Sequence, residues 1–124
     1  MSKKISYSFV IADLFHYGHL RVLQQASKYS DYHICAVLTD EICKKWQGQN
    51  LCTMAERKKV IKSSNYVDEV MAQNSLDPTE NLKKIISIMN IVHKEAVNYL
   101  EGANSSLGIF YIIRNRFQIL KKKI

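Results

Sequence analysis

Two histidines, His16 and His19, stand three positions apart in the segment "ADLFHYGHLRVL" of a chain that has four histidines in all. A neutral imidazole offers one N–H donor, and Gly18 between the two leaves the backbone open to close approach. The segment lies between an apolar run and a helix-like run, where the first N–H groups of a helix carry a partial positive charge. These features predict a phosphate-binding site and favour transfer at phosphorus, which depends mainly on positioning and charge stabilisation.

Two other interpretations of the histidine pair stay open. The rings could simply cap and pack against the start of the helix. They could also join Asp13 as metal ligands, but zinc uses three or four protein ligands, and no further ligand is near in the sequence. We assign no metal ligand and favour the phosphate site, because the pair follows a strand and begins a helix.

The elements that must position this pair alternate along the chain. Residues 5–11 are apolar and β-branched, as in a buried strand, and residues 18–30 have the apolar spacing of a helix. Residues 32–38 form a second predicted strand. Strand, helix and strand in this order make a βαβ unit with parallel strands. The ligand of such a sheet lies at the carboxyl ends of the strands, so we expect phosphates to bind over residues 11–19.

The rest of the chain continues the alternation. A helix begins at Thr53, because Glu56 three residues later completes a capping box, and another begins at Asp77. We therefore expect a single domain over residues 1–124, of the α/β class, with a Rossmann-like open parallel sheet of about five strands and helices on both faces. Further strands are predicted at 66–71, 90–92 and 108–113, and a short basic helix at 116–124.

Composition limits the partners. The chain has 18 basic and 11 acidic residues, a net charge of +7, which favours anionic ligands. Three cysteines and the absence of a long apolar run predict a cytoplasmic protein without a membrane span. We do not expect nucleic acid binding, since no aromatic-rich basic platform accompanies the basic residues at the end of the chain. His33 and Cys35 alternate along the second strand and are expected to be ordinary strand residues.

The order of several motifs resembles the H-x-G-H nucleotidyltransferases. The resemblance is greatest to their cytidylyltransferase branch, which includes the glycerol-3-phosphate, choline-phosphate and ethanolamine-phosphate enzymes. The segments that carry it are "ADLFHYGHLRVLQQASKYSDYHICAVLTDE", "KKWQGQNLCTMAERKKVI", "YVDEVM" and "IVH".

The resemblance implies an activity and a set of site residues. Family members couple CTP with a phosphorylated alcohol, release pyrophosphate and form a CDP-alcohol, usually with Mg²⁺ and as a homodimer. His16 and His19 correspond to the two histidines of the family motif, and Asp68 corresponds to the aspartate of its Y-V-D-E-V segment. The nucleotide contacts implied are those of Ile11, Ala12, Asp13, His16, Gly18, His19 and Arg114.

Several positions differ from the family's pattern. Gln47 stands where the family has a lysine before a loop glycine, and Lys44 and Lys45 are the cations that could take over its contact with phosphate. Asn65 replaces the family's basic residue before Y-V-D-E-V. The segments G-D-D-W and R-T-x-G-I-S-T-T are missing, and Arg114 alone corresponds to the arginine of the second.

Three hypotheses follow from these observations. The leading one is a cytidylyltransferase acting on a small phosphorylated alcohol, with His16, His19, Lys44 and Lys45 as catalytic candidates. The second is a nucleotide-binding module with little or no catalysis, which the missing segments favour. The third is an adenylyltransferase of the same superfamily.

Overall fold

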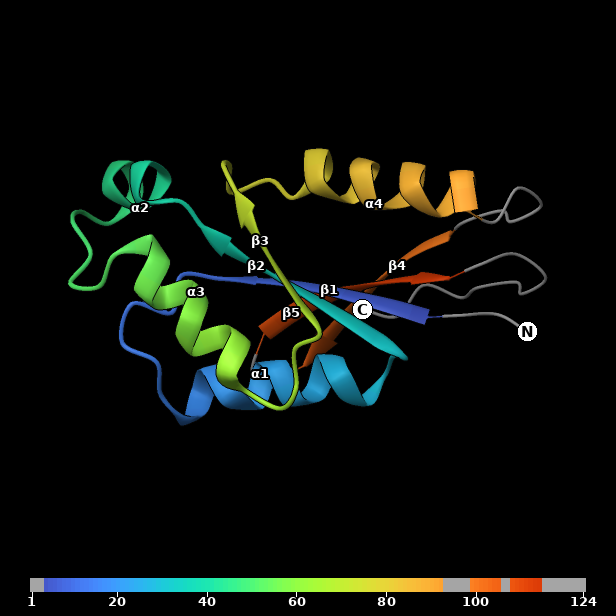
Figure 1. The fold of residues 1–124 in the computed structure, drawn as a ribbon, viewed down its shortest axis with the longest axis horizontal. Helices are drawn as coiled ribbons and strands as arrows, with labels where there is room; N and C mark the ends of the chain where they lie inside the picture. The colour runs from blue at the N-terminus through green and yellow to red at the C-terminus, as the bar shows by residue number, and fades with distance from the viewer. Residues whose placement is uncertain (1–3, 93–98, 106–107, 115–124) are drawn as a thin grey trace.

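The computed structural model describes residues 4–92, 99–105 and 108–114. Its first strands and helices alternate along the chain (Figure 1). Within the described ranges, none of the helices is both long and apolar enough to cross a membrane. The elements in chain order are β1 (Lys4–Val10), α1 (Tyr17–Lys28), β2 (Tyr32–Leu38), α2 (Asp40–Trp46), α3 (Met54–Ser63), β3 (Glu69–Gln73), α4 (Thr79–Val92), β4 (Tyr99–Ser105) and β5 (Gly108–Arg114).

The sheet has the strand order β3-β2-β1-β5-β4. β1 and β2 run parallel, from the pair Ile5 and Tyr32 to the pair Val10 and Val37, and β3 runs parallel to β2. The predicted α/β class with a parallel sheet is therefore confirmed. The carboxyl ends of these three strands meet at one end of the sheet, where residues 11–16 leave β1.

β4 and β5 differ from the fully parallel sheet that the alternation predicts. β5 pairs antiparallel with β1, and β4 pairs antiparallel with β5. Only residues 106 and 107 separate these two strands in the sequence. So short a connection joins antiparallel neighbours, whereas a parallel pair needs a crossover of about a dozen residues or more. The sheet is therefore mixed, with its parallel part on the side of β2 and β3.

Two segments need correction. Residues 90–92, predicted as a strand, form the end of α4, and residues 40–46, for which the pattern predicts no element, form α2. Leu82, Ile85 and Ile86 follow a helical period that leads into 90–92. So short an apolar run cannot by itself separate a strand from the end of a helix.

The start of α3 is the capping box that the sequence predicts. The Thr53 hydroxyl oxygen accepts the N–H of Glu56 at 3.2 Å, and the Glu56 carboxylate accepts the N–H of Thr53 at 2.8 Å. Two N–H groups without a helical partner are thereby satisfied. The helix predicted over 116–124 lies outside the described residues.

Helices cover both faces of the sheet, as predicted (Figure 1). Leu23 of α1 and Ile61 of α3 are fully buried on one face, which fixes these two helices against β2. The cluster on that face comprises Ala12, Leu23, Cys35, Val37 and Ile61. The cluster on the α4 face comprises Tyr7, Ile34, Ala36, Leu82 and Ile85.

His33 of β2 is completely buried and belongs to the core. Its Nδ1 lies 2.6 Å from the carbonyl oxygen of Tyr66 and must donate to it, because a carbonyl only accepts. Its Nε2 therefore accepts the hydroxyl of Ser8 at 2.8 Å. Burial lowers the pKa of His33, and burial raises the pKa of the Cys35 thiol to about 12. Both are structural strand residues, as expected.

Burial of a neutral histidine makes stability depend on pH. The pKa of folded His33 lies below the ordinary value of 6.5, so the unfolded chain binds more protons just below that pH. We expect the free energy of unfolding to fall as the pH is lowered from about 7.5 to about 5.5, measured by urea titration. His33→Gln, which keeps an amide beside Ser8 and Tyr66, should be less stable but show a flatter dependence. Equal slopes in the two proteins would contradict this role of His33.

Candidate functional site

The segment that joins β1 to α1 carries the candidate site. Residues 11–16 leave the carboxyl end of β1 and enter α1 at Tyr17. Within it, Ala12 is buried and has a φ of 54°, a left-handed backbone that costs roughly 1–2 kcal/mol when a side chain is present. Strain of this kind persists only where the surrounding structure holds it, and it is concentrated at functional sites.

The two histidines cap the start of α1 with the same ring nitrogen. His16 Nδ1 accepts the N–H of Gly18 at 2.9 Å, and His19 Nδ1 accepts the N–H of His16 at 3.1 Å. A backbone N–H can only donate, so Nδ1 of each ring is unprotonated. The proton of each neutral ring therefore sits on Nε2, and neither Nε2 has a partner among the described residues. Capping thus leaves two N–H donors available at the helix start.

The rings of this pair lie close together. Their centroids are 4.1 Å apart with a tilt of 43°, and the ring of His19 stacks on Phe15 at 5.6 Å. Burial lowers the pKa of His19, and the neighbouring ring of His16 lowers it further. His19 is therefore neutral at pH 7, which matches its capping role and leaves its Nε2 as a neutral donor.

Gly18 is required by the His16 ring. A Cβ at this position would lie 2.7 Å from Cε1 of His16, closer than Cβ atoms approach their neighbours, and 3.1 Å from its Nδ1, so the ring would have to move. The predicted reason for this glycine was room for a phosphate beside the backbone. In the structure, the space next to its Cα is occupied by the imidazole that caps the helix. The contact that the structure gives Gly18 is therefore with the capping ring, and the phosphate contact stays a prediction.

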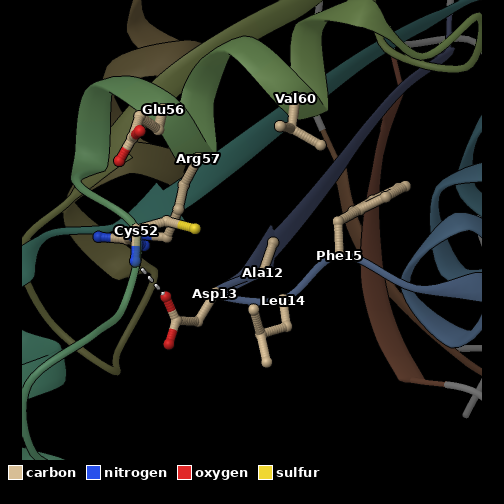
Figure 2. Close-up of a pocket in the computed structure, with 8 residues that line it drawn as sticks. All are labelled: Ala12, Asp13, Leu14, Phe15, Cys52, Glu56, Arg57 and Val60. Atoms are coloured by element: carbon tan, nitrogen blue, oxygen red, sulfur yellow. Dashed lines mark hydrogen bonds between the residues drawn. The ribbon is translucent and has the colours of Figure 1, made fainter.

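Asp13 ties this segment to the loop between α2 and α3. Its two carboxylate oxygens accept the N–H of Cys52 at 2.9 Å and the N–H of Leu51 at 3.0 Å. These two bonds, that of Cys52 first, hold the pKa of Asp13 below its ordinary value. Figure 2 shows the carboxylate turned toward Cys52. The carboxylate therefore holds the loop in place beside the histidine segment.

Arg57 of α3 joins the ends of two strands. It is 1% exposed, and its Nη1 donates to the carbonyl of Ile11 at 2.9 Å and to that of Leu38 at 2.9 Å. Its Nη2 donates to Asp40 at 2.6 Å, an ion pair at the start of α2. The hydrogen bond from Arg57 lowers the pKa of Asp40. One side chain thus fixes the carboxyl ends of β1 and β2 and the first turn of α2.

Sequence reasoning missed the role of Arg57. The motif "AER" was recognised as part of the resemblance, but a charged residue on a helix is expected to face water. The available signal was spacing, because Arg57 stands four positions before Ile61 and therefore on the same face of α3. That face packs against the sheet.

Asp13 and Arg57 also border a pocket of about 360 Å³ between the histidine segment and α3 (Figure 2). The two histidines are not part of its wall. The pocket therefore lies beside the residues that lead to His16, and Leu14, Phe15 and Val60 give it an apolar side. Its lining comprises Ala12, Asp13, Leu14, Phe15, Cys52, Glu56, Arg57 and Val60.

The predicted cations are not joined to the histidines. Lys44 and Lys45 are exposed in the last turn of α2. Gln47 ends that helix, and its Nε2 donates to Asn50 at 3.0 Å. Within the described part of the chain, no hydrogen bond or ion pair links these three side chains to the site. The structure therefore leaves the two imidazoles and the helix start as the donors of the site.

Asp68 and Arg114 lie at the other end of the sheet. Asp68 accepts the N–H of His33 at 2.8 Å, near the amino end of β2. The backbone of Arg114 pairs with Lys4, the first residue of β1, because β5 runs antiparallel to β1. The histidine segment follows the last residue of β1. The structure thus does not bring the predicted nucleotide contact of Arg114, or Asp68, to this site.

Metal binding is not favoured by the donor set. Among the described residues, no three His, Cys, Asp or Glu side chains lie together as a metal site would need. Both oxygens of Asp13 and both oxygens of Asp40 already accept N–H groups. The carboxylates beside the histidine segment are therefore engaged in holding the protein together.

Comparison with known proteins finds one family over most of the chain. Residues 11–116 match the family described as cytidylyltransferase-like. The chain is 37% identical over 111 residues to choline-phosphate cytidylyltransferase 2 of Arabidopsis thaliana, and this alignment covers 88% of this chain and 36% of the plant protein. It is 33% identical over 75 residues to glycerol-3-phosphate cytidylyltransferase of Bacillus subtilis, and this alignment covers 60% of this chain and 57% of the bacterial protein.

A solved structure agrees with the fold. The lipopolysaccharide core biosynthesis protein from Thermoplasma volcanium superimposes with a TM-score of 0.60 at 17% identity, over 65% of this chain and 66% of that chain. At this identity the likeness concerns the fold alone. The chain spans between about a third and somewhat more than half of the length of the two relatives named above.

Gly18→Ala should detach the His16 ring from the helix start. The new Cβ would displace the ring, which then loses its bond to the N–H of residue 18. A lost cap costs about 1 kcal/mol, and alanine recovers up to about 1 kcal/mol relative to glycine inside a helix, so the unfolding free energy should change little. The ¹⁵N chemical shifts of the His16 ring should change from those of a single tautomer to the averaged values of two tautomers. Unchanged shifts would disprove the contact.

Arg57→Met should destabilise the protein by about 2–6 kcal/mol. The methionine side chain keeps most of the packing volume, but the buried carbonyl of Leu38 and the partly buried carbonyl of Ile11 lose their donor at about 1–3 kcal/mol each. Thermal and urea unfolding measure the loss.

Asp40→Asn is the matched control for Arg57→Met. The amide keeps an oxygen for Arg57, and the side chain of Asp40 is 57% exposed, so water compensates for the lost charge. The control should therefore lose far less stability than Arg57→Met. Equal losses would show that the ion pair, and not the carbonyl bonds, carries the effect.

Proposed function

Because the chain belongs to the cytidylyltransferase-like family, we propose that it transfers the cytidylyl group of CTP to a small phosphorylated alcohol. The products are a CDP-alcohol and pyrophosphate. The two relatives described above act, by their names, on choline phosphate and glycerol 3-phosphate, and a third, at 42% identity over 59 residues, is the ethanolamine-phosphate cytidylyltransferase of Mus musculus. That alignment covers 48% of this chain and 15% of the mouse protein.

The observation that carries the proposal is the pair of fixed tautomers at the start of α1. Each Nδ1 is held by a backbone N–H, which orients the ring and leaves Nε2–H as the only donor. Two such donors beside the positive end of a helix suit oxygens of a phosphate chain. The rings need no rearrangement to bind, because the capping bonds already orient them.

The reaction requires no covalent intermediate with the protein. A phosphate oxygen of the alcohol attacks the α-phosphorus of CTP, and the bond from that phosphorus to the bridging oxygen breaks. Pyrophosphate leaves with the bonding electron pair. The Nε2–H groups of His16 and His19 donate to the phosphate oxygens on which charge accumulates. A single donor of this kind is worth roughly 3–4 kcal/mol in a transition state.

Mg²⁺ enters this proposal as part of the substrate. The nearby carboxylates of Asp13 and Asp40 are held by N–H donors of the chain. Mg²⁺ keeps several waters and prefers phosphate oxygens to a cage of protein ligands. We propose that it arrives bound to the triphosphate, where it neutralises part of the charge, and we assign it no ligand from this chain.

A nucleotide-binding module with little turnover is the second candidate. It is favoured by the exposed positions of Lys44 and Lys45 and by Gln47, whose amide is bound to Asn50. Transfer at phosphorus then depends on neutral donors alone, and charge-assisted hydrogen bonds are about twice as strong as neutral ones. Turnover therefore separates the two candidates, while CTP binding is common to both.

We also propose a homodimer and a cytoplasmic location. Leu14, Tyr17 and Leu51 are large apolar side chains exposed on and beside the histidine segment, which supports a partner surface there. The three cysteines are free thiols, which supports a reducing compartment.

The double variant His16→Asn, His19→Gln tests the proposed roles. Asparagine is a good N-cap and glutamine suits the third position of a capping box, so α1 should stay intact while both Nε2–H donors are lost. We expect pyrophosphate release to fall by at least about 100-fold, with a small change in thermal stability. The assay uses CTP with glycerol 3-phosphate, phosphocholine and phosphoethanolamine.

Calorimetric titration of CTP and ATP completes the experiment. Tighter binding of CTP supports the cytidylyltransferase, and tighter binding of ATP supports the adenylyltransferase alternative. CTP binding without pyrophosphate release in the unmodified protein supports the binding module. Full activity of the double variant would disprove the role of the histidines.

A further inference from the structure

Three lysines of α3 line a pocket that the proposed reaction does not use. Arg57 and Ile61 turn one face of this helix into the core. The three lysines lie on the other faces of the helix. Lys59 and Lys62 are exposed, and Lys58 is half-buried. The pocket has a volume of about 410 Å³ and is lined by Lys58, Lys59, Lys62, Ser63 and Val70.

This α3–β3 pocket is separate from the one beside the histidines. It lies between α3 and β3. β3 is the strand at one edge of the sheet (Figure 1). Val70 of β3 pairs with Cys35 of β2, the neighbouring strand of the sheet. The pocket beside Asp13 uses Glu56, Arg57 and Val60 of the same helix, so the two pockets share no lining residue. One helix therefore carries two pockets on different faces.

The positive charges of the α3–β3 pocket are not compensated within the described part of the chain. None of the three ammonium groups forms an ion pair there, since the one ion pair found joins Arg57 to Asp40. No carboxylate lines the pocket, and the hydroxyl of Ser63 donates to the carbonyl of Val60. The chain as a whole has a net charge of +7. A ligand would therefore meet three cations without having to displace a carboxylate.

Two of these lysines repel each other along the helix. Lys58 and Lys62 are four positions apart, a spacing at which like charges repel. The helix dipole favours Lys62 in the last turn, but it gives no such support to Lys58 or Lys59. Glu56 is the only acidic residue of α3, and it is bound to the N–H of Thr53. A bound anion would relieve the repulsion between Lys58 and Lys62.

We propose that the α3–β3 pocket is a second anion site, which takes a phosphate-bearing ligand with at least two negative charges. Lysine ammonium groups act as compact cations toward phosphate, through strong charge-assisted hydrogen bonds. The lysine stems and Val70 supply an apolar wall beside the charges. The phosphate belongs either to a free small molecule or to the headgroup of an anionic phospholipid, which share this chemistry.

The test uses the full chain and two phosphate probes. Inorganic pyrophosphate is titrated while backbone amide NMR shifts are followed, and flotation measures binding to phosphatidylcholine vesicles that contain phosphatidylglycerol. We expect pyrophosphate to shift the amides of residues 58–63 and 70. The triple variant Lys58→Gln, Lys59→Gln, Lys62→Gln should weaken this binding by at least about tenfold, because each lost ammonium removes a charge-assisted bond.

The matched control is Lys28→Gln, Lys83→Gln, Lys84→Gln, which lowers the net charge equally at exposed positions of α1 and α4. It should retain the binding. Far-UV circular dichroism checks folding, and the single variant Lys59→Gln serves if the triple variant unfolds. Shifts around residues 16–19 report binding at the histidines and are counted separately.

Each outcome bears on the α3–β3 pocket. A free phosphate ligand is supported if pyrophosphate shifts the amides of α3, if the triple variant abolishes these shifts and if the control retains them. Vesicle binding with the same pattern, without pyrophosphate shifts at α3, supports a lipid headgroup. Absence of both, or equal losses in the triple variant and the control, would overturn the proposal.

Discussion

A single buried guanidinium holds the candidate site together. Parallel strands that end at one end of a sheet leave their last carbonyls in need of donors, and Arg57 supplies them to Ile11 and Leu38. The same group pairs with Asp40, so α2 starts from the same anchor. Asp13 then accepts the N–H groups of the loop that leads into α3. The histidine segment has an irregular backbone, but the end of β2, the start of α2 and the loop before α3 are all held in place by charge-assisted bonds.

Helix capping and the proposed chemistry use different atoms of the same rings. Helix starts are usually capped by a short oxygen-bearing side chain. His16 and His19 cap through Nδ1 and keep Nε2–H for a ligand. Gly18 makes this possible, since the ring of His16 lies against its Cα. The local stability of α1 and the orientation of the donors therefore depend on one arrangement.

Local chemistry was predictable from the sequence, and contacts between distant segments were not. His16 and His19 were placed correctly because a change from strand to helix is visible in the neighbouring residues. Arg57 was missed because an arginine on an amphipathic helix is expected outside, and only its spacing from Ile61 indicates otherwise. Arg114 is a predicted nucleotide contact only through its correspondence to an arginine of the family's last motif, and such a correspondence carries no information on strand direction. A two-residue connection reverses β5 and takes that residue to the opposite end of the sheet.

The bonds that define the site join parts of the chain that are far apart in sequence. Asp13 accepts hydrogen bonds from Leu51 and Cys52, which stand 38 and 39 positions later in the chain. Arg57 donates to the carbonyl of Ile11, which stands 46 positions earlier. Closing loops of this length costs entropy that only a nearly complete fold repays. The site should therefore form late in folding, after β2 and α3 have docked. A nascent chain that ends before residue 57 would carry both histidines without the buried guanidinium that anchors the segment before them.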